Sequence, residues 1–221
     1  MTNAFASVLF DLDGTFADTA PDLGAALNCL RADLDLPPVA LQQLRPHTSH
    51  GVRGMLGAGL GVAPGESRYV ALQQAFLAHY AKALCVHTTL FPGIDELISR
   101  LEANDMPWGI VTNKTQRFTL PLLDQLGYAK RANCIVSGDS SPRAKPAAHP
   151  MLLASALIVR EPRQCLYVGD DLRDIQAGQA VGMTTVAVRY GYLGDGVTID
   201  DWGADHILNH ADDIAALAGV A

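Results

Sequence analysis

The 221-residue sequence predicts an α/β protein in which a doubly wound parallel sheet carries an inserted all-helical domain. Two observations lead to this fold. From residue 91 onward, short continuous apolar runs alternate with segments of helical periodicity, which is typical of parallel strands covered by helices on both faces. Between residues 19 and 88, by contrast, the patterns are helical and no convincing strand is present, which indicates an all-helical insertion.

The first strand is the apolar run at residues 8–10, and two aspartates, Asp11 and Asp13, follow it directly, with Gly14 and Thr15 next. Alternation along an extended strand places the two carboxylates on the same side. At a separation of roughly 4–5 Å, such a pair costs about 1 kcal/mol in water and several times more in a protein cleft. We therefore expect a positive group or a proton between them.

A helix is expected to begin at Thr19, whose hydroxyl is a suitable cap, with Pro21 in the first turn and Asp22 at the third position. Leucines then recur at helical spacing, at Leu23, Leu27, Leu30 and Leu34. Further helical patterns, broken by prolines and glycines, continue to about residue 84.

The second part of the chain predicts four more strands separated by helices. The strands are expected at residues 108–112, 134–137, 165–169 and 184–188. The helices are expected at residues 93–103, 116–126, 149–159 and 171–181. Residues 1–18 and 89–221 would thus form a Rossmann-like core, and residues 19–88 a separate helical domain.

Composition narrows the class of protein. The net charge is −7 and no run of Lys or Arg is present, which argues against nucleic acid or an anionic membrane as a partner. No stretch approaches the roughly 20 apolar residues of a membrane span, and the N-terminus does not read as a signal peptide. The four cysteines are scattered without a CxxC pair and are expected to be reduced. We expect a cytoplasmic protein, either a monomer or a homodimer.

Polar side chains follow the expected strands at the edge where parallel sheets bind ligands. Besides the two aspartates after the first strand, the sequence places Thr112-Asn113-Lys114 after the second and GDDLRD (169–174) after the fourth. Lys145 lies in the loop past the third strand. Each signal alone is weak, since Lys145 is compatible with a solvated surface charge and GDDLRD with an ordinary helix start. Together they point to one site.

Phosphoryl transfer is the chemistry that these residue types suit. One carboxylate can attack phosphorus, and a second aspartate can act as general acid and then as general base. A bound Mg²⁺ would relieve the repulsion between these carboxylates and a phosphate, with Asp170 completing its oxygen ligands. Lys145 and the Thr112 hydroxyl would hold phosphate oxygens, and Gly14 would let backbone N–H groups approach them.

This set of motifs resembles the haloacid dehalogenase superfamily, and the resemblance covers essentially the whole chain. The matching motifs, in order, are DLDGT (11–15), the threonine of VTNK (111–114), the lysine of AKP (144–146) and GDDLRD (169–174). The resemblance implies that Asp11 is the nucleophile and Asp13 the general acid and base. It implies that Thr112, Asn113 and Lys145 bind phosphate, and the neighbouring Thr15 and Lys114 are expected to contact the substrate as well.

The resemblance also implies a magnesium site. Its ligands would be Asp11, the backbone carbonyl of Asp13 and Asp170. Asp171 or Asp174 would assist, through water or by orienting the motif lysine, although Asp171 is equally compatible with a plain helix-start acid. The acid at position 13 disfavours the dehalogenases themselves, because a departing halide needs no proton.

The helical insertion resembles the cap of the phosphoglycolate phosphatase-like branch of this superfamily. VTNK, Arg117-Phe118, RYGY (189–192) and WGAD (202–205) are also similar to the related N-acetylmuramic acid 6-phosphate phosphatases. The implied function is a Mg²⁺-dependent phosphatase that hydrolyses a small phosphate monoester through an aspartyl-phosphate. Phosphoglycolate is the first expected substrate, N-acetylmuramic acid 6-phosphate is the alternative, and a sugar phosphomutase is a further one. A receiver-type phospho-acceptor module is disfavoured, because receiver domains are near half this length and lack such an insertion.

The stretch RPHTSHGVRGM (45–55) lies between two helical patterns of the insertion and is expected to reach the part of the substrate beyond the phosphate. We expect Arg53 and His50 to make these contacts, with an ordinary polar loop as the alternative. Tyr190 and Tyr192 are expected to border the mouth of the site, with a packing loop as the alternative.

Overall fold

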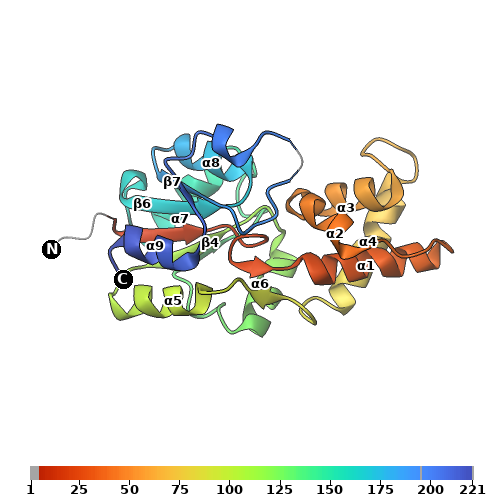
Figure 1. Ribbon diagram of the computed structural model, residues 1–221, viewed down its shortest axis with the longest axis horizontal. Coiled ribbons are helices and arrows are strands. Elements are labelled where there is room, and N and C mark those ends of the chain that lie inside the picture. The colour runs from red at the N-terminus through yellow and green to blue at the C-terminus, as the bar shows by residue number, and fades with distance from the viewer. Residues whose placement is uncertain (1–4, 195, 221) are drawn as a thin grey trace.

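The computed structural model describes residues 5–194 and 196–220, and its core is a six-stranded parallel sheet (Figure 1). The strand order is β5-β4-β1-β6-β7-β8. The strands are β1 (Ser7–Phe10), β4 (Trp108–Val111), β5 (Cys134–Val136), β6 (Cys165–Gly169), β7 (Thr184–Val188) and β8 (His206–Leu208). From β1 the chain builds outward through β4 and β5, and then returns to β6 on the other side, so the strand order reverses around β1. The predicted doubly wound parallel sheet is confirmed.

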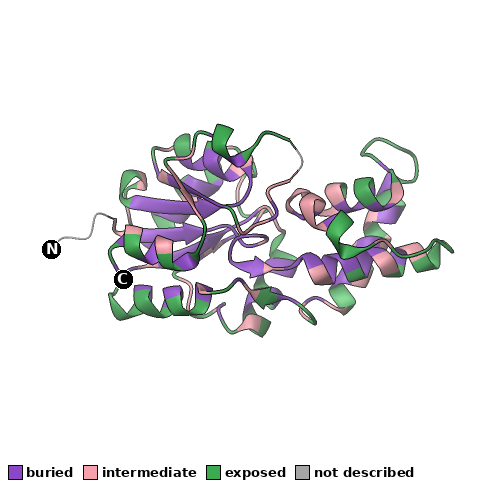
Figure 2. Cartoon of the chain, in the orientation of Figure 1, coloured by how far each residue is buried: buried purple, intermediate pink, exposed green. Residues whose placement is uncertain are grey.

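Helices cover both faces of the sheet because successive strand residues point to opposite sides. Val8 and Phe10 of β1 belong to the apolar cluster that also holds the buried faces of α5, α6 and α9, whereas Leu9 belongs to the cluster under α7 and α8. The helices are α5 (Ile94–Ala103), α6 (Gln116–Leu126), α7 (His149–Ile158), α8 (Leu172–Gln179) and α9 (Ala211–Ala218). Figure 2 shows the strands as almost continuously buried.

The expected helices and strands of the core occur with boundaries that differ by one or two residues. Strand β8 and helix α9 of the core were not predicted. Strand β8 has three residues, begins with His206, and is half-buried along its length, so it lacks the continuous apolar run that marked the other strands. Its pairing with β7 makes it an edge strand, and only the register Val186 to His206 in the folded sheet reveals it.

The expected helical insertion is present, and its helices lie within residues 20–82. They are α1 (Ala20–Asp33), α2 (Leu41–Leu44), the 3₁₀ helix η1 (Arg45–His50), α3 (Gly51–Leu60) and α4 (Tyr69–Lys82). In Figure 1 they lie to one side of the sheet. Two chain crossings join them to the core through β2 (Ala17–Asp18) and β3 (Thr89–Leu90), which pair antiparallel. Leu34, expected on the buried face of the first helix, lies beyond the end of α1 and is 42% exposed.

The start of α1 differs from the expectation. Pro21 and Asp22 lie in the first turn as predicted, but the Thr19 hydroxyl does not cap the helix. It donates instead to the carboxylate of Asp13 at 2.5 Å. The first N–H groups at this end are accepted by the hydroxyl of Tyr192, a residue distant in sequence, so tertiary contacts replaced the local cap.

None of the helices in the described part of the chain has the length and apolar character that a membrane span requires. The four cysteines, Cys29, Cys85, Cys134 and Cys165, form no disulfide.

The two crossings are fastened together by Asp22. Its buried carboxylate accepts the backbone N–H groups of Val86, His87 and Thr88, at 2.9–3.1 Å, and the Thr88 hydroxyl at 2.7 Å. One side chain of α1 therefore holds the segment that returns to the core.

We expect Asp22→Ala to destabilise the protein by about 2–4 kcal/mol, because several donors lose their charged acceptor. The melting temperature should fall by roughly 5–15 °C in a chain of this length. Asp33→Ala is the matched control: Asp33 belongs to the same helix, and its pair with His79 is 59% exposed on the aspartate side. A melting temperature that falls equally in both variants would contradict this role of Asp22.

Candidate active site

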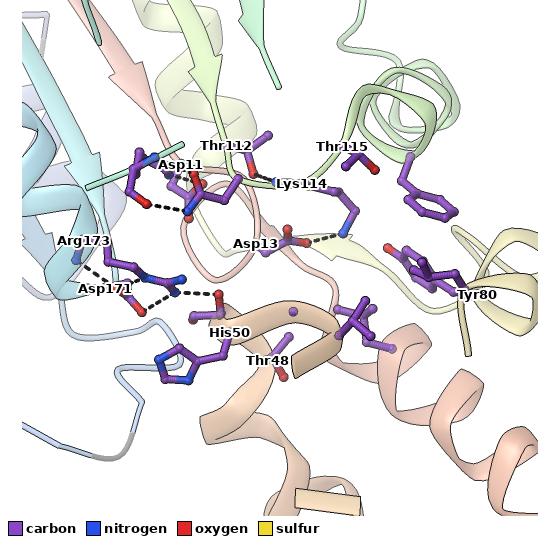
Figure 3. Close-up of a pocket in the computed structure, with 18 of the residues that line it drawn as sticks. Asp11, Asp13, Thr48, His50, Tyr80, Thr112, Lys114, Thr115, Asp171 and Arg173 are labelled. Atoms are coloured by element: carbon purple, nitrogen blue, oxygen red, sulfur yellow. Dashed lines mark hydrogen bonds and ion pairs between the residues drawn. The ribbon is translucent and has the colours of Figure 1, made fainter. Parts of the chain in front are cut away.

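The carboxyl ends of three neighbouring strands bring the predicted site residues together. Strand β1 pairs with β4 on one side and β6 on the other, and Phe10 is in register with both Ile110 and Val168. Asp11, Thr112 and Asp170, which follow these strands, therefore meet at one edge of the sheet. Beyond this edge lies a cavity of about 350 Å³ between the core and the helical insertion (Figure 3).

Lys145 stands at the centre of the polar groups. Its ammonium lies 2.8 Å from Oδ1 of Asp11, 2.7 Å from Oδ1 of Asp174, and 2.8 Å from both the Val111 carbonyl and the Tyr167 hydroxyl. The side chain is 3% exposed. Burial by itself lowers the pKa of a lysine, but the two carboxylates outweigh it, so the pKa of Lys145 is raised and the group is charged.

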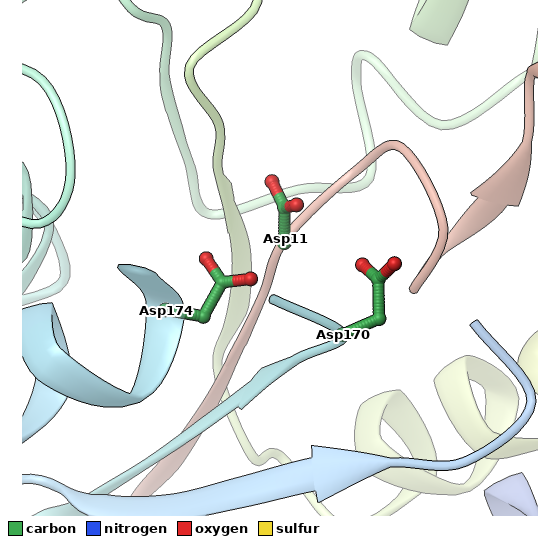
Figure 4. A group of neighbouring side chains, drawn as sticks. All are labelled: Asp11, Asp170 and Asp174. Carbon is green, nitrogen blue, oxygen red and sulfur yellow. The ribbon is translucent and has the colours of Figure 1, made fainter. Parts of the chain in front are cut away.

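Three buried aspartates, Asp11, Asp170 and Asp174, surround one small volume (Figure 4). Each offers one carboxylate oxygen, and these oxygens all lie within 4.8 Å of one another. Burial raises the pKa of Asp11 to about 7, with Asp174 adding to the shift and Lys145 opposing it. Burial, followed by Asp11 and Asp174, also raises the pKa of Asp170 well above its ordinary range.

The composition of this cluster fits a hard divalent cation. All of its ligand atoms are carboxylate oxygens, which Mg²⁺ and Ca²⁺ prefer. A bound dication would favour the ionised carboxylates against the burial and mutual repulsion that raise their pKa values. The cluster differs from the predicted ligand set in one respect. The carboxylate of Asp174, which was expected only to assist, belongs to it beside Asp11 and Asp170. The backbone carbonyl of Asp13 stays a predicted ligand.

Asp13 has a separate cationic partner. Its carboxylate accepts from the ammonium of Lys114 at 2.8 Å, shown by the dashed line in Figure 3. Lys114 is 8% exposed, and its Nζ lies 4.9 Å from the centre of the Tyr80 ring. The two aspartates that follow β1 are thus each paired with a different lysine. Lys114, which was expected to contact the substrate, lines the cavity, and its ammonium forms an ion pair with Asp13.

Gly14 and Thr15 contact the side chain of Asp170 and do not line the cavity. A Cβ on Gly14 would lie 2.2 Å from Oδ2 of Asp170, and its φ of +93° disfavours any other residue. The N–H of Gly14 itself donates to the Ala17 carbonyl at 3.0 Å, within the turn. The expected approach of backbone N–H groups of this loop to a phosphate stays a prediction. The Thr15 hydroxyl donates to Asp170 at 2.9 Å.

Asn113 fastens the loop that carries Lys145. Its amide nitrogen donates to the backbone carbonyl of Lys145 at 3.0 Å, and its amide oxygen accepts the backbone N–H of the same residue at 2.9 Å. Thr112 is 3% exposed, lines the cavity, and accepts the N–H of Lys114 at 3.1 Å through its hydroxyl. Asn113 also lines the cavity, and both the Thr112 hydroxyl proton and the second N–H of the Asn113 amide are available to a ligand.

Asp171 takes the helix-start role. It is the N-cap of α8, forms a capping box with Asp174, and pairs with Arg173 at 2.7 Å. Arg173 in turn donates to the backbone carbonyl of Ser49 at 2.7 Å, which links the core to η1. Sequence reasoning did not single out Arg173, because an arginine in the first turn of a helix gives no signal of a contact with a distant segment.

The helical insertion contributes one wall of the cavity. His50 lines it, together with Thr48 and Ser49, and burial lowers the pKa of His50. Arg53, the other residue of the insertion that was expected to contact the substrate, is exposed and does not line the cavity. The arginines that do are Arg117 and Arg173. The apolar part of the lining comes from Leu23, Val52, Phe76, Leu77, Tyr80 and Phe118.

Tyr167 is a second residue that the sequence analysis missed. It lies within β6, where an aromatic residue reads as core, yet its hydroxyl is 2.8 Å from Nζ of Lys145 and 2.9 Å from the Val111 carbonyl. Burial raises the pKa of this phenol, so the neutral hydroxyl helps to fix the ammonium.

Comparison with known proteins agrees with this geometry. A family model described as haloacid dehalogenase-like hydrolase matches residues 8–188. The chain is 42% identical over 204 residues to an N-acetylmuramic acid 6-phosphate phosphatase of Pseudomonas aeruginosa, covering 92% of this chain and 90% of the relative. It is also 42% identical over 203 residues to a phosphoglycolate phosphatase of Xanthomonas campestris, covering 91% of each.

Among solved structures, a crystal structure of a predicted phosphoglycolate phosphatase from Haemophilus somnus superposes with a TM-score of 0.86 at 25% identity. The superposition covers 98% of this chain and 99% of the other.

The raised pKa of Asp11 makes the stability of the metal-free protein depend on pH. Because its folded pKa is about 7 and its ordinary value 3.8, ionisation costs folding free energy as the pH rises from about 4 to above 7. Asp11→Asn removes this cost. In EDTA, we expect the melting temperature of Asp11→Asn minus that of the wild type to increase between pH 5 and pH 8.

The control for this measurement is Asp35→Asn. Asp35 is exposed in a turn with φ of +56°, a conformation that asparagine adopts readily. Its difference from the wild type should stay constant with pH. A constant difference for Asp11→Asn as well would show that ionisation of Asp11 does not lower the stability of the folded protein.

Proposed function

Because the chain belongs to the haloacid dehalogenase-like hydrolase family, we propose that it hydrolyses the phosphate monoester of a small metabolite. The observation that carries this proposal is the buried group of Asp11, Asp170, Asp174 and Lys145 beside a cavity. Binding and cleaving a phosphate ester requires a nucleophile, positive charge and a sheltered space, and this edge of the sheet supplies all three.

In the proposed reaction, Asp11 is the nucleophile. Lys145 holds its Oδ1, so the other oxygen is the one that forms a bond to phosphorus while the bond from phosphorus to the ester oxygen breaks. The product is an aspartyl-phosphate and an alkoxide. Thr112 and Lys145 are the proposed partners of the phosphate oxygens, and Asn113 keeps the lysine loop in place.

Asp13 is the proposed general acid and base. It would give a proton to the departing alkoxide and then take one from the water that attacks the aspartyl-phosphate, which regenerates Asp11 and releases phosphate. Lys114 and Thr19 hold its carboxylate in a fixed orientation. Asp11, as nucleophile, thus contacts Lys145, whereas Asp13, as general acid and base, contacts Lys114.

We propose Mg²⁺ as the cofactor, held by Asp11 and Asp170, with Asp174 as the third acidic group. When bound, the ion would neutralise the carboxylates and allow a dianionic phosphate to approach. Asp174 also holds the ammonium of Lys145 at 2.7 Å, which supports the proposed role of orienting the lysine. Asp171 would act on α8 and Arg173 and not on the metal.

Residues 19–88 are proposed to be a cap domain over a core of residues 1–18 and 89–221. Its segment η1 reaches the catalytic edge: the Ser49 hydroxyl donates to Asp170 at 3.2 Å. Such a cap would exclude water from the reaction and contact the part of the substrate beyond the phosphate.

Phosphoglycolate and N-acetylmuramic acid 6-phosphate are the two candidate substrates, because relatives named for each are equally similar to the chain. The cavity favours the second. Its volume of about 350 Å³ and its wall of Phe76, Leu77 and Phe118 suit a ligand much larger than a two-carbon acid.

Phosphate release from the two esters, measured side by side, tests the proposed function. We expect turnover of at least one of them with Mg²⁺, with a higher kcat/KM for the amino sugar, and loss of turnover in EDTA that added Mg²⁺ restores. An isomerised sugar phosphate without free phosphate would support a phosphomutase instead. Stoichiometric labelling by acetyl phosphate without turnover would support a phospho-acceptor module.

Covalent catalysis predicts that Asp11→Asn loses at least about 10³-fold in turnover, because an amide cannot form the aspartyl-phosphate. Circular dichroism and the melting temperature should show that the variant remains folded. Retention of more than a few per cent of the wild-type rate would count against a covalent intermediate on Asp11.

A further inference from the structure

Tyr192 lies in the loop that follows β7, and its hydroxyl is fully engaged at the start of the helical insertion. The oxygen accepts the backbone N–H groups of Thr19 at 2.8 Å and Ala20 at 2.9 Å, and lies 2.9 Å from Oδ1 of Asp18, to which it donates its proton. The side chain is 5% exposed. A single phenol from the core thus caps α1 and holds the crossing that leads into it.

The same residue contacts the acidic cluster through its backbone. The N–H of Tyr192 donates to Oδ2 of Asp170 at 2.9 Å. The preceding residue is pressed against the same side chain, since a Cβ on Gly191 would lie 2.2 Å from the Cβ of Asp170. The loop therefore has a fixed position relative to the catalytic edge.

Asp18 extends this connection into the cavity wall. Both of its carboxylate oxygens bind the guanidinium of Arg45, at 2.7 and 2.5 Å, and that guanidinium lies 5.3 Å from the centre of the Tyr192 ring. Arg45 is the first residue of η1, the segment that carries Ser49 and His50 to the cavity. The start of α1 and the start of η1 thus both contact the side chain of Tyr192, the first through hydrogen bonds and the second through the guanidinium of Arg45.

We propose that Tyr192 is a positioning residue that sets the orientation of the helical insertion over the catalytic edge and thereby the contacts with the part of the substrate beyond the phosphate. This inference rests on the proposed phosphatase function. The physical reason is that any rotation of α1 about its crossing must break hydrogen bonds to the Tyr192 hydroxyl, while the backbone of the same residue stays bound to Asp170.

The test is Tyr192→Phe, which removes the hydroxyl and keeps the ring and the bond to Asp170. Two measurements are made: amide hydrogen exchange at residues 19 and 20, and steady-state kinetics with N-acetylmuramic acid 6-phosphate, phosphoglycolate and acetyl phosphate. Acetyl phosphate extends little beyond its phosphoryl group, so it should not depend on the insertion. Tyr128→Phe is the control, because it removes a hydroxyl bonded to Asp95 in the core.

We expect exchange at residues 19 and 20 to become at least tenfold faster in Tyr192→Phe but not in Tyr128→Phe. The KM of the larger active substrate should rise about tenfold, as expected for loss of roughly one hydrogen bond's worth of positioning, with acetyl phosphate unchanged within about twofold. Arg45→Met should raise the same KM. The double variant should fall short of the product of the two factors, since both act through Asp18.

Unchanged exchange at residues 19 and 20, or an equal loss with acetyl phosphate and the larger substrate, would overturn the inference, because a purely structural role affects all substrates alike. A wild-type protein that hydrolyses none of the three phosphorylated compounds would overturn the proposed function instead. The exchange measurement would then still decide whether Tyr192 holds the start of α1.

Discussion

The structure depends on one electrostatic constraint: three buried carboxylates share the surroundings of a single buried ammonium. Lys145 contacts Asp11 and Asp174 directly, whereas burial, followed by the charges of Asp11 and Asp174, raises the pKa of Asp170. One ammonium cannot offset three ionised carboxylates in a water-poor site, and the raised pKa values of Asp11 and Asp170 are the consequence. An acidic cluster of this kind suits a dication, which would then allow a phosphate to approach. It also requires that the surrounding groups be placed accurately.

Much of the neighbouring backbone is arranged to hold this cluster. Gly14 and Gly191 leave room for Asp170, whose carboxylate then accepts from Thr15 and from the backbone of Tyr192. On the far side, Asn113 fixes the backbone of the lysine loop. These contacts come from segments far apart in the sequence. A site assembled in this way is preorganised, so little rearrangement is required when charge develops during the reaction.

The same contacts tie the helical insertion to the catalytic edge. Ser49 donates to Asp170, Arg173 donates to the backbone of Ser49, and Tyr192 joins Asp170 to the first turn of α1. The residues that would distinguish substrates are therefore mechanically connected to the residues that would cleave them. Cavity volume and apolar lining, more than any single charged residue, then become the features that separate a small acidic substrate from an amino sugar.

Local pattern alone determined the sheet, the helical insertion and the set of residues at the strand ends, because apolar periodicity and the order of motifs are properties of adjacent residues. The hydrogen-bond and ion-pair partners of individual side chains were decided only by the tertiary structure. The Thr19 hydroxyl donates to Asp13 and does not cap α1, Lys114 pairs with Asp13, Arg53 is exposed, and the Tyr167 hydroxyl contacts the ammonium of Lys145. Hydrogen bonds and ion pairs depend on distances between segments that are remote along the chain, and those distances exist only once the sheet has brought its strand ends together.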